Sequence, residues 1–229
     1  MKQETGRPFK RAMLEAQDMA GDAKVEGDGY VLHQYPDRET YRKVQIAGNK
    51  AKLRMQFVKE SHIRTLSEYI NEEMGQTTFG ICHGTRRGAE QAWFRQNLMG
   101  NPNIIGTEIS DTADQFPDTV QWDFHEVNPD WIEKADFIYS NSWDHACEPE
   151  TAFNAWFGAL RQGGRLLLDY TRGQSRGAAN ALDPFGIDYE ALIFLLGKLF
   201  GNRASLLSTI DTRRTNKEYK ARVIIVEKK

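Results

Sequence analysis

Hydrophobic and polar positions change their spacing repeatedly along this chain. From residue 78 onward, short apolar runs typical of strands alternate with segments whose apolar residues recur at helical spacing. The predicted strands are Thr78–Cys82, Asn103–Glu108, Thr119–Trp122, Phe137–Ser140, Arg165–Tyr170, Ala204–Thr209 and Ala221–Val226. The predicted helices are Gly88–Leu98, Ser110–Gln115, Pro129–Glu133, Glu150–Leu160 and Tyr189–Phe200. This alternation predicts an α/β fold with a mainly parallel sheet and right-handed crossovers.

The part of the chain before residue 78 is more polar. Ser61–Met74 has helical spacing and predicts a helix laid on the sheet. Arg7–Ala20 predicts a second helix, and Tyr30–Tyr35 a short edge strand. We therefore divide the chain into an N-terminal extension or cap, residues 1–58, and a main domain, residues 59–229.

Composition and charge narrow the classes of partner. The chain has 229 residues, 40% of them hydrophobic, a formal net charge of −2 and a pI of about 6.2. These values favour neither a nucleic acid nor an anionic membrane as the partner. The N-terminus lacks the apolar core of a signal peptide, and Tyr189–Phe200 is too short to span a bilayer. We expect a cytoplasmic protein that acts on a small molecule, and leave its oligomeric state open.

Cysteine and histidine usage predicts neither disulfides nor metal. The two cysteines, Cys82 and Cys147, form no disulfide framework and fit a reducing compartment. The five histidines and two cysteines show no metal-ligand spacing, so no metal site is expected.

A glycine turn and an acid form the first candidate binding site. Gly84 follows the first strand of the predicted domain, and Glu108 ends the second strand. In a parallel sheet this spacing places the turn and the carboxylate side by side at the carboxyl edge. The ribose diol of a nucleoside can donate to such a carboxylate.

A dinucleotide site is a weaker alternative at the same turn. The fingerprint G-x-G-x-x-G, counted from Cys82, requires glycine at Cys82, Gly84 and Arg87, and only one of the three is glycine. A nucleotide-dependent oxidoreductase is therefore less favoured.

Five segments in order resemble motifs of the class I S-adenosylmethionine-dependent methyltransferases. They are Ile81–Thr85, Ile105–Ser110, Gln121–Phe124, Ala135–His145 and Leu160–Asp169. The resemblance implies a Rossmann-like, seven-stranded, mainly parallel sheet with a C-terminal antiparallel hairpin and helices on both faces. It also implies S-adenosylmethionine as cofactor, and methyl transfer to a small-molecule or saccharide-type acceptor.

The same resemblance implies a set of cofactor-binding residues. They are Cys82, His83, Gly84, Thr85, Glu108, Asp123, Phe124 and Asn141. Glu108 is assigned to the ribose and Asp123 to the adenine amino group. A helix cap at Glu108, and a turn-forming role for Asp123 or Asn141, are the structural alternatives. His83 is expected over the methionine portion or in solvent, and Cys82 is alternatively a small buried filler.

His145 is the predicted catalytic residue. It follows the fourth strand, on the loop that faces the methyl group in the family, and histidine titrates near neutrality. Asp144 either orients that imidazole or caps the helix that begins near Glu150. The long loop Thr171–Asp188 follows the fifth strand and is a candidate for acceptor specificity.

The turn departs from the family pattern. Gly80 stands where the family has an acid, while Cys82 and Arg86 replace its first and third glycines. These departures leave a catalytically degenerate binding module as an alternative.

Overall fold

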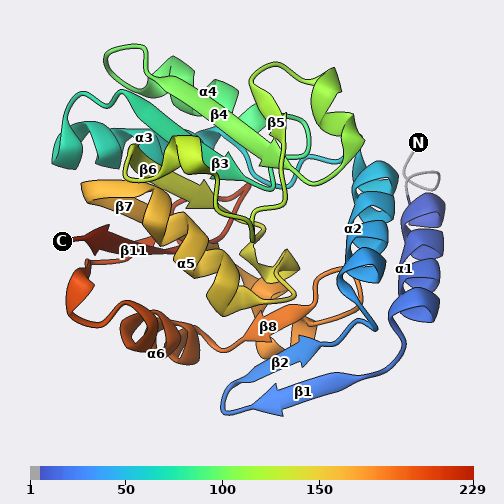
Figure 1. The fold of residues 1–229 in the computed structure, drawn as a ribbon. Helices are drawn as coiled ribbons and strands as arrows, with labels where there is room; N and C mark the ends of the chain where they lie inside the picture. The colour runs from blue at the N-terminus through green and yellow to red at the C-terminus, as the bar shows by residue number, and fades with distance from the viewer. Residues whose placement is uncertain (1–5) are drawn as a thin grey trace.

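The computed structural model describes residues 6–229 and shows a central sheet between two layers of helices (Figure 1). The helices are α1 (Gly6–Ala20), α2 (Arg38–Lys52), α3 (Glu60–Met74), α4 (Ala89–Asn97), α5 (Pro149–Ala159) and α6 (Tyr189–Phe200). The strands are β1 (Lys24–Gly27), β2 (Tyr30–His33), β3 (Phe79–His83), β4 (Asn103–Glu108), β5 (Thr119–Gln121), β6 (Ala135–Ser140), β7 (Leu160–Tyr170), β8 (Phe185–Ile187), β9 (Ala204–Leu206), β10 (Ile210–Asp211) and β11 (Arg222–Lys228). Residues 1–5, the start of the predicted extension, lie outside the described residues.

The main sheet has the order β10-β11-β7-β6-β3-β4-β5. Strands β3 to β7 pair in parallel, and β11 is antiparallel to β7. Strands β9 and β10 pair with opposite ends of β11, through Leu206 with Val226 and Ile210 with Val223. Because two short strands share one position, the sheet has eight strands instead of the predicted seven. The predicted parallel sheet with an antiparallel end is confirmed.

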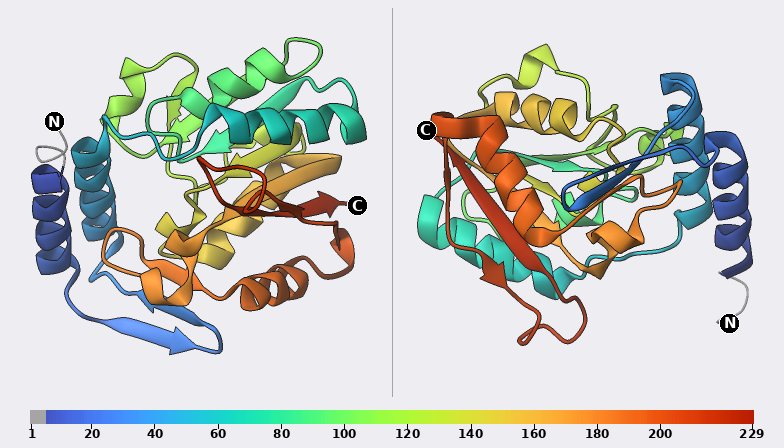
Figure 2. Two further views of the ribbon diagram at one scale, coloured as in Figure 1. Left: turned by 180° about the vertical axis from the view of Figure 1, so that it is seen from behind. Right: turned by 90° about the horizontal axis from the view of Figure 1, so that it is seen from below.

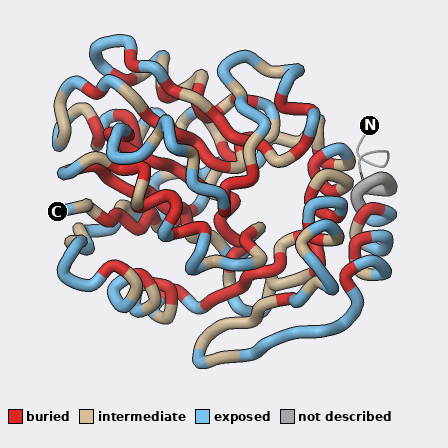
Figure 3. The backbone as a smooth tube through the Cα atoms, in the orientation of Figure 1, coloured by how far each residue is buried: buried red, intermediate tan, exposed pale blue. Residues whose placement is uncertain are grey.

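Successive residues of the strands bury their side chains on opposite faces of the sheet. In β7, Leu166 and Leu168 pack in the core with α5 and α6, whereas Leu167 packs in the core with α3 and α4. All three side chains are fully buried. Figure 3 shows this burial concentrated along the central strands. The sheet is therefore covered on both faces, and its carboxyl edge is the place where a site can form.

Helix α2 was not predicted from the sequence. It stands beside α1 beyond the carboxyl ends of the parallel strands (Figures 1 and 2). Asp37 caps it by accepting a hydrogen bond from the Thr40 amide at 2.7 Å. Its buried positions are Tyr41, Val44, Gln45, Gly48, Asn49 and Lys52. They have helical spacing, but half of them are polar, so hydrophobic periodicity does not reveal them.

A small second sheet connects the N-terminal segment to the main domain. Strand β2 pairs with β1 and also with β8, which belongs to the long loop after β7. The strand predicted at Tyr30–Tyr35 is present as β2, but it is the middle strand of this sheet and not an edge strand.

Within residues 6–229, the helices are all too short or too polar to cross a bilayer.

Candidate functional site

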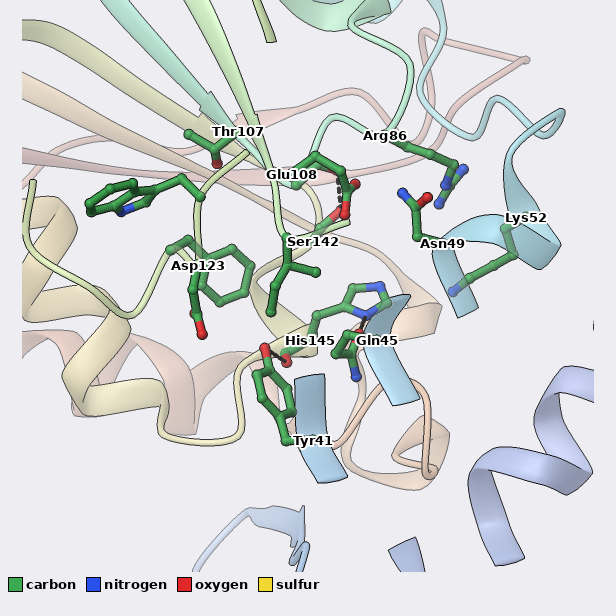
Figure 4. A pocket seen from close by; sticks show the side chains of 14 residues that line it. Tyr41, Gln45, Asn49, Lys52, Arg86, Thr107, Glu108, Asp123, Ser142 and His145 are labelled. Carbon is green, nitrogen blue, oxygen red and sulfur yellow. Dashed lines mark hydrogen bonds between the residues drawn. The ribbon is translucent and has the colours of Figure 1, made fainter. Parts of the chain in front are cut away.

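Two adjoining cavities lie at the carboxyl ends of β3, β4 and β6, next to α2. Figure 4 shows the first of them. The space between the lining atoms, open solvent included, is about 490 Å³ in the first and about 1020 Å³ in the second. Five residues line both cavities: Lys52, Gly84, Arg86, Ser142 and His145. The two spaces therefore meet at the turn after β3.

The turn after β3 requires glycine at position 84. Gly84 has a φ of +73°, and a Cβ there would lie 2.7 Å from the Ser142 Cβ. The amides of Gly84 and Thr85 donate to the Thr107 carbonyl at 2.9 and 3.1 Å. These hydrogen bonds hold the turn against the end of β4.

Glu108, the last residue of β4, lines the first cavity together with Gly84. Its side chain is buried, and its Oε1 accepts a hydrogen bond from the Ser110 amide at 3.2 Å. Burial raises the pKa of Glu108, although this amide and the nearby Arg86 oppose the rise. A carboxylate has about four acceptor positions, so Glu108 can accept further bonds from a ligand. The structure thus brings the predicted turn and acid to one cavity.

Helix α2 supplies four side chains to the cavities that sequence reasoning missed. They are Tyr41, Gln45, Asn49 and Lys52 (Figure 4). The hydroxyl of Tyr41 donates to the His145 carbonyl at 3.1 Å, and Thr112 donates to Asn49 Oδ1 at 2.8 Å. The helix is therefore attached to the loops after β6 and β4, on both sides of the first cavity.

Asp123 lines the first cavity and is paired with protein groups. Its Oδ1 accepts from the amide and the Nδ1 of His125, and its Oδ2 accepts from Arg38 at 3.1 Å and Arg42 at 3.2 Å. Burial opposes ionisation, but these partners together lower the pKa of Asp123 to about 2. These bonds stabilise the turn and anchor α2, and the contact of Asp123 with adenine stays a prediction.

His145 lines both cavities, and Gln45 fixes its tautomer. Gln45 donates through Nε2 to the Leu182 carbonyl at 3.0 Å, so its Oε1 faces His145 Nδ1 at 2.7 Å. Nδ1 must then carry the hydrogen, which leaves Nε2 unprotonated in the neutral ring. Nε2 lies 3.3 Å from Asp183, whose carboxylate also pairs with Lys52 at 3.4 Å. Burial, with a contribution from Lys52, lowers the pKa of His145 to about 4.

Neither predicted role of Asp144 is seen. Asp183, from the loop after β7, is the carboxylate beside the His145 imidazole. Helix α5 begins after Glu148 with no side-chain cap. Asp144 is instead buried against the second cavity, and its Oδ1 has no hydrogen-bond partner among the described residues.

The side chains of Cys82 and His83 face away from both cavities. Cys82 is fully buried in the core beneath α3 and α4, where burial raises the pKa of its thiol. His83 bonds to the Thr107 hydroxyl at 2.8 Å and stacks on Trp156 at 4.7 Å. Burial lowers the pKa of His83 to about 3. The structure places these two side chains in the packed faces of the sheet instead of either cavity, and their contact with a cofactor stays a prediction.

The remaining predicted residues divide between the two cavities. Phe124 lines the first, while Thr85 and Asn141 line the second. The predicted specificity loop, Thr171–Asp188, also reaches the second cavity, and its Gln174 donates to the Asn141 carbonyl at 2.7 Å.

The comparisons with known proteins found matches to solved structures. No family model and no curated protein matches the chain. A Burkholderia thailandensis 1,6-didemethyltoxoflavin N1-methyltransferase, solved with its substrate and S-adenosylhomocysteine, has a TM-score of 0.65 and 15% identity, covering 90% of this chain and 99% of the other. The N-methyltransferase NodS of Bradyrhizobium japonicum, solved with S-adenosylhomocysteine, has a TM-score of 0.59 and 12% identity, covering 80% and 98%.

A TehB-like methyltransferase from Corynebacterium glutamicum has a TM-score of 0.53 and 15% identity, covering 79% of this chain and 93% of the other. The [4+2]-cyclase SpnF also matches, with a TM-score of 0.54 and 13% identity, covering 72% and 81%. One fold therefore carries more than one kind of reaction. The strand order, the antiparallel end of the sheet and these likenesses agree, and the chain has the fold of the class I S-adenosylmethionine-dependent methyltransferases.

Proposed function

We propose that this protein is an S-adenosylmethionine-dependent methyltransferase that acts on a small-molecule or saccharide-type acceptor. The observation that carries the proposal is the meeting of Gly84 and Glu108 at one cavity, at the carboxyl ends of neighbouring parallel strands. Ligands of open parallel sheets bind at this edge. Two structural neighbours were solved with S-adenosylhomocysteine, which supports the choice of cofactor.

The residues present fit an adenosyl group. Glu108 is a buried carboxylate with acceptor positions left for the ribose hydroxyls, and Phe124 lines the same cavity and would pack against the adenine. The missing Cβ at Gly84 lets the backbone approach the ligand. Thr85 and Asn141 would line the path toward the second cavity.

When bound, the cofactor supplies a methyl group already activated on a sulfonium. The protein then has to hold the acceptor in line with that group, and such positioning contributes about 7–11 kcal/mol in favourable cases. His145 stands where the two cavities meet, with Nε2 unprotonated and Asp183 beside it. In this proposal Nε2 takes the proton that the acceptor loses, and Asp183 stabilises the imidazolium.

Residues 1–58 act as a cap in this proposal. Helix α2 covers the first cavity, and Arg38 and Arg42 hold it there by pairing with Asp123. This anchoring would enclose the adenosyl group and exclude water from it.

Calorimetric titration with S-adenosylhomocysteine tests the proposal. Micromolar binding is expected, together with no binding of NAD(H) or NADP(H). No binding of S-adenosylhomocysteine at millimolar concentration would contradict the proposal, and binding of a nicotinamide cofactor instead would favour an oxidoreductase.

The alternative of a degenerate binding module is favoured by one observation. Arg86 stands where the family has glycine, adopts a φ of +47°, and lines both cavities at their junction. Its guanidinium donates to the Met55 carbonyl at 2.9 Å and lies over the Phe57 ring. Binding of the cofactor without methyl transfer to any acceptor in an extract of small molecules would favour this alternative.

A further inference from the structure

Two carboxylates that line the second cavity each have one buried oxygen without a hydrogen-bond partner among the described residues. These oxygens are Glu90 Oε2 and Asp144 Oδ1. Glu90 is 4% exposed to solvent and Asp144 is 7% exposed. Buried polar atoms are nearly always paired, and an unpaired carboxylate oxygen carries the largest cost. Two such oxygens on residues that line one cavity indicate a ligand that supplies hydrogen-bond donors.

Each of the two carboxylates has one cation nearby, because Arg86 lowers the pKa of Glu90 and Lys52 lowers that of Asp144, but burial outweighs both effects. Glu90 accepts the neutral amide of Gln56 through Oε1 at 2.8 Å, and burial raises its pKa to about 7. Asp144 lies near Asp183, and burial together with this second carboxylate raises its pKa. Both acids therefore favour a ligand that brings positive charge or N–H groups.

The cations at the cavity are engaged with other groups. Lys52 pairs with Asp183 at 3.4 Å. Arg86 donates to the Met55 carbonyl and covers the Phe57 ring at 5.1 Å. An anionic ligand would thus meet two carboxylates that these cations compensate only in part, whereas an amine would satisfy them.

We propose that the second cavity binds an amine, with Glu90 and Asp144 as its hydrogen-bond acceptors. The inference rests on the proposed methyltransferase function, because two amines could occupy this place. One is the methyl acceptor, and the other is the amino group at the amino-acid end of the cofactor. The chemistry of recognition is the same for both.

If the amine is the acceptor, its nitrogen lone pair forms the new bond to the methyl carbon. The bond between that carbon and sulfur breaks, and sulfur keeps the electron pair. The methylated nitrogen then releases one proton, which His145 Nε2 accepts, as in the proposed function. No oxidant or other co-reactant is required.

The test uses the full-length protein and three isosteric variants. Glu90→Gln and Asp144→Asn remove each charge, and Glu68→Gln, on the exposed face of α3, is the matched control. Without ligand, the first two variants should raise the melting temperature, because a buried unpaired charge is removed. Lower melting temperatures for both variants would show that the carboxylates stabilise the fold, and would overturn the proposal.

Two calorimetric comparisons identify the source of the amine. The first sets S-adenosylhomocysteine against 5′-methylthioadenosine, which lacks the amino acid. The second sets a panel of alkyl, aryl and sugar amines against their N-acetyl derivatives. If the cofactor supplies the amine, both variants lower the affinity for S-adenosylhomocysteine about tenfold or more and leave the affinity for 5′-methylthioadenosine unchanged. If the acceptor supplies it, wild type prefers free amines and both variants lose that preference.

Two results together would overturn the proposal. Wild type would bind the amines and their N-acetyl derivatives equally, and neither variant would change the affinity for S-adenosylhomocysteine. The wild-type comparisons stand even where a variant fails to fold. Failure of the proposed function looks different, because wild type would then bind neither adenosyl compound. The melting temperatures and the amine comparison would still report on the cavity.

Discussion

Replacing Glu90 by glutamine should stabilise the protein in a pH-dependent way. Burial raises the pKa of this carboxyl group from 4.5 to about 7. Between these two values the folded state binds more protons than the unfolded state, so the free energy of unfolding falls as the pH rises. The difference of about 2.5 pKa units corresponds to about 3 kcal/mol, an upper bound that is fully present only above about pH 7.

Urea denaturation of wild type and Glu90→Gln, near pH 4 and near pH 8, measures this cost. The variant should be more stable by up to about 3 kcal/mol at the higher pH and close to wild type at the lower pH. The Gln56 amide can still donate to the new side chain, so packing is preserved. A variant that is less stable near pH 8, or whose advantage is the same at both pH values, would refute the reasoning. Glu68→Gln should show no such pH dependence.

Three further predictions concern the first cavity and its cap. Glu108→Gln should weaken the binding of S-adenosylhomocysteine about tenfold or more, since hydrogen bonds to a charged acceptor contribute about 1.5–3 kcal/mol. An unchanged calorimetric affinity would show that Glu108 does not contact the ribose. Asp123→Asn should lower the free energy of unfolding by about 1–2 kcal/mol near neutral pH, after allowance for screening of the half-exposed arginines. Because the pKa of Asp123 is lowered to about 2, this difference should shrink as the pH falls from about 4 toward 2 in denaturation experiments, and a constant difference would contradict it. His145→Gln should reduce kcat about 100-fold or more with little change in cofactor affinity; a parallel loss of calorimetric affinity would indicate a binding role instead.

The sheet was predictable because its strands are buried on both faces. A run such as Leu166–Leu168 is apolar at every position, which identifies a central strand without further context. The turn at Gly84 and the acid at Glu108 followed from the same reasoning, because strand ends place them at one edge.

Helix α2 could not be found in this way because its buried stripe faces a polar site instead of a core. Gln45, Asn49 and Lys52 are buried on it, and only the N-cap at Asp37 was a readable signal. A capping residue followed by polar positions at helical spacing is the pattern that would have indicated it.

The pairings inside the site depend on tertiary structure. Asp183 meets His145 because β8 carries its loop back toward β2, and Arg38 reaches Asp123 because α2 crosses the sheet edge. Sequence order instead suggested Asp144 as the partner of His145, since the two are neighbours. The side chains of Cys82 and His83 lie away from the cavities for a related reason: they follow the strand and enter the two packed faces of the sheet.

A crystal structure with S-adenosylhomocysteine tests the central claim most directly. The account predicts the ribose hydroxyls within hydrogen-bond distance of the Glu108 carboxylate, the adenine beside Phe124, and the sulfur toward the second cavity. A ligand that binds elsewhere, or whose ribose makes no contact with Glu108, would contradict it.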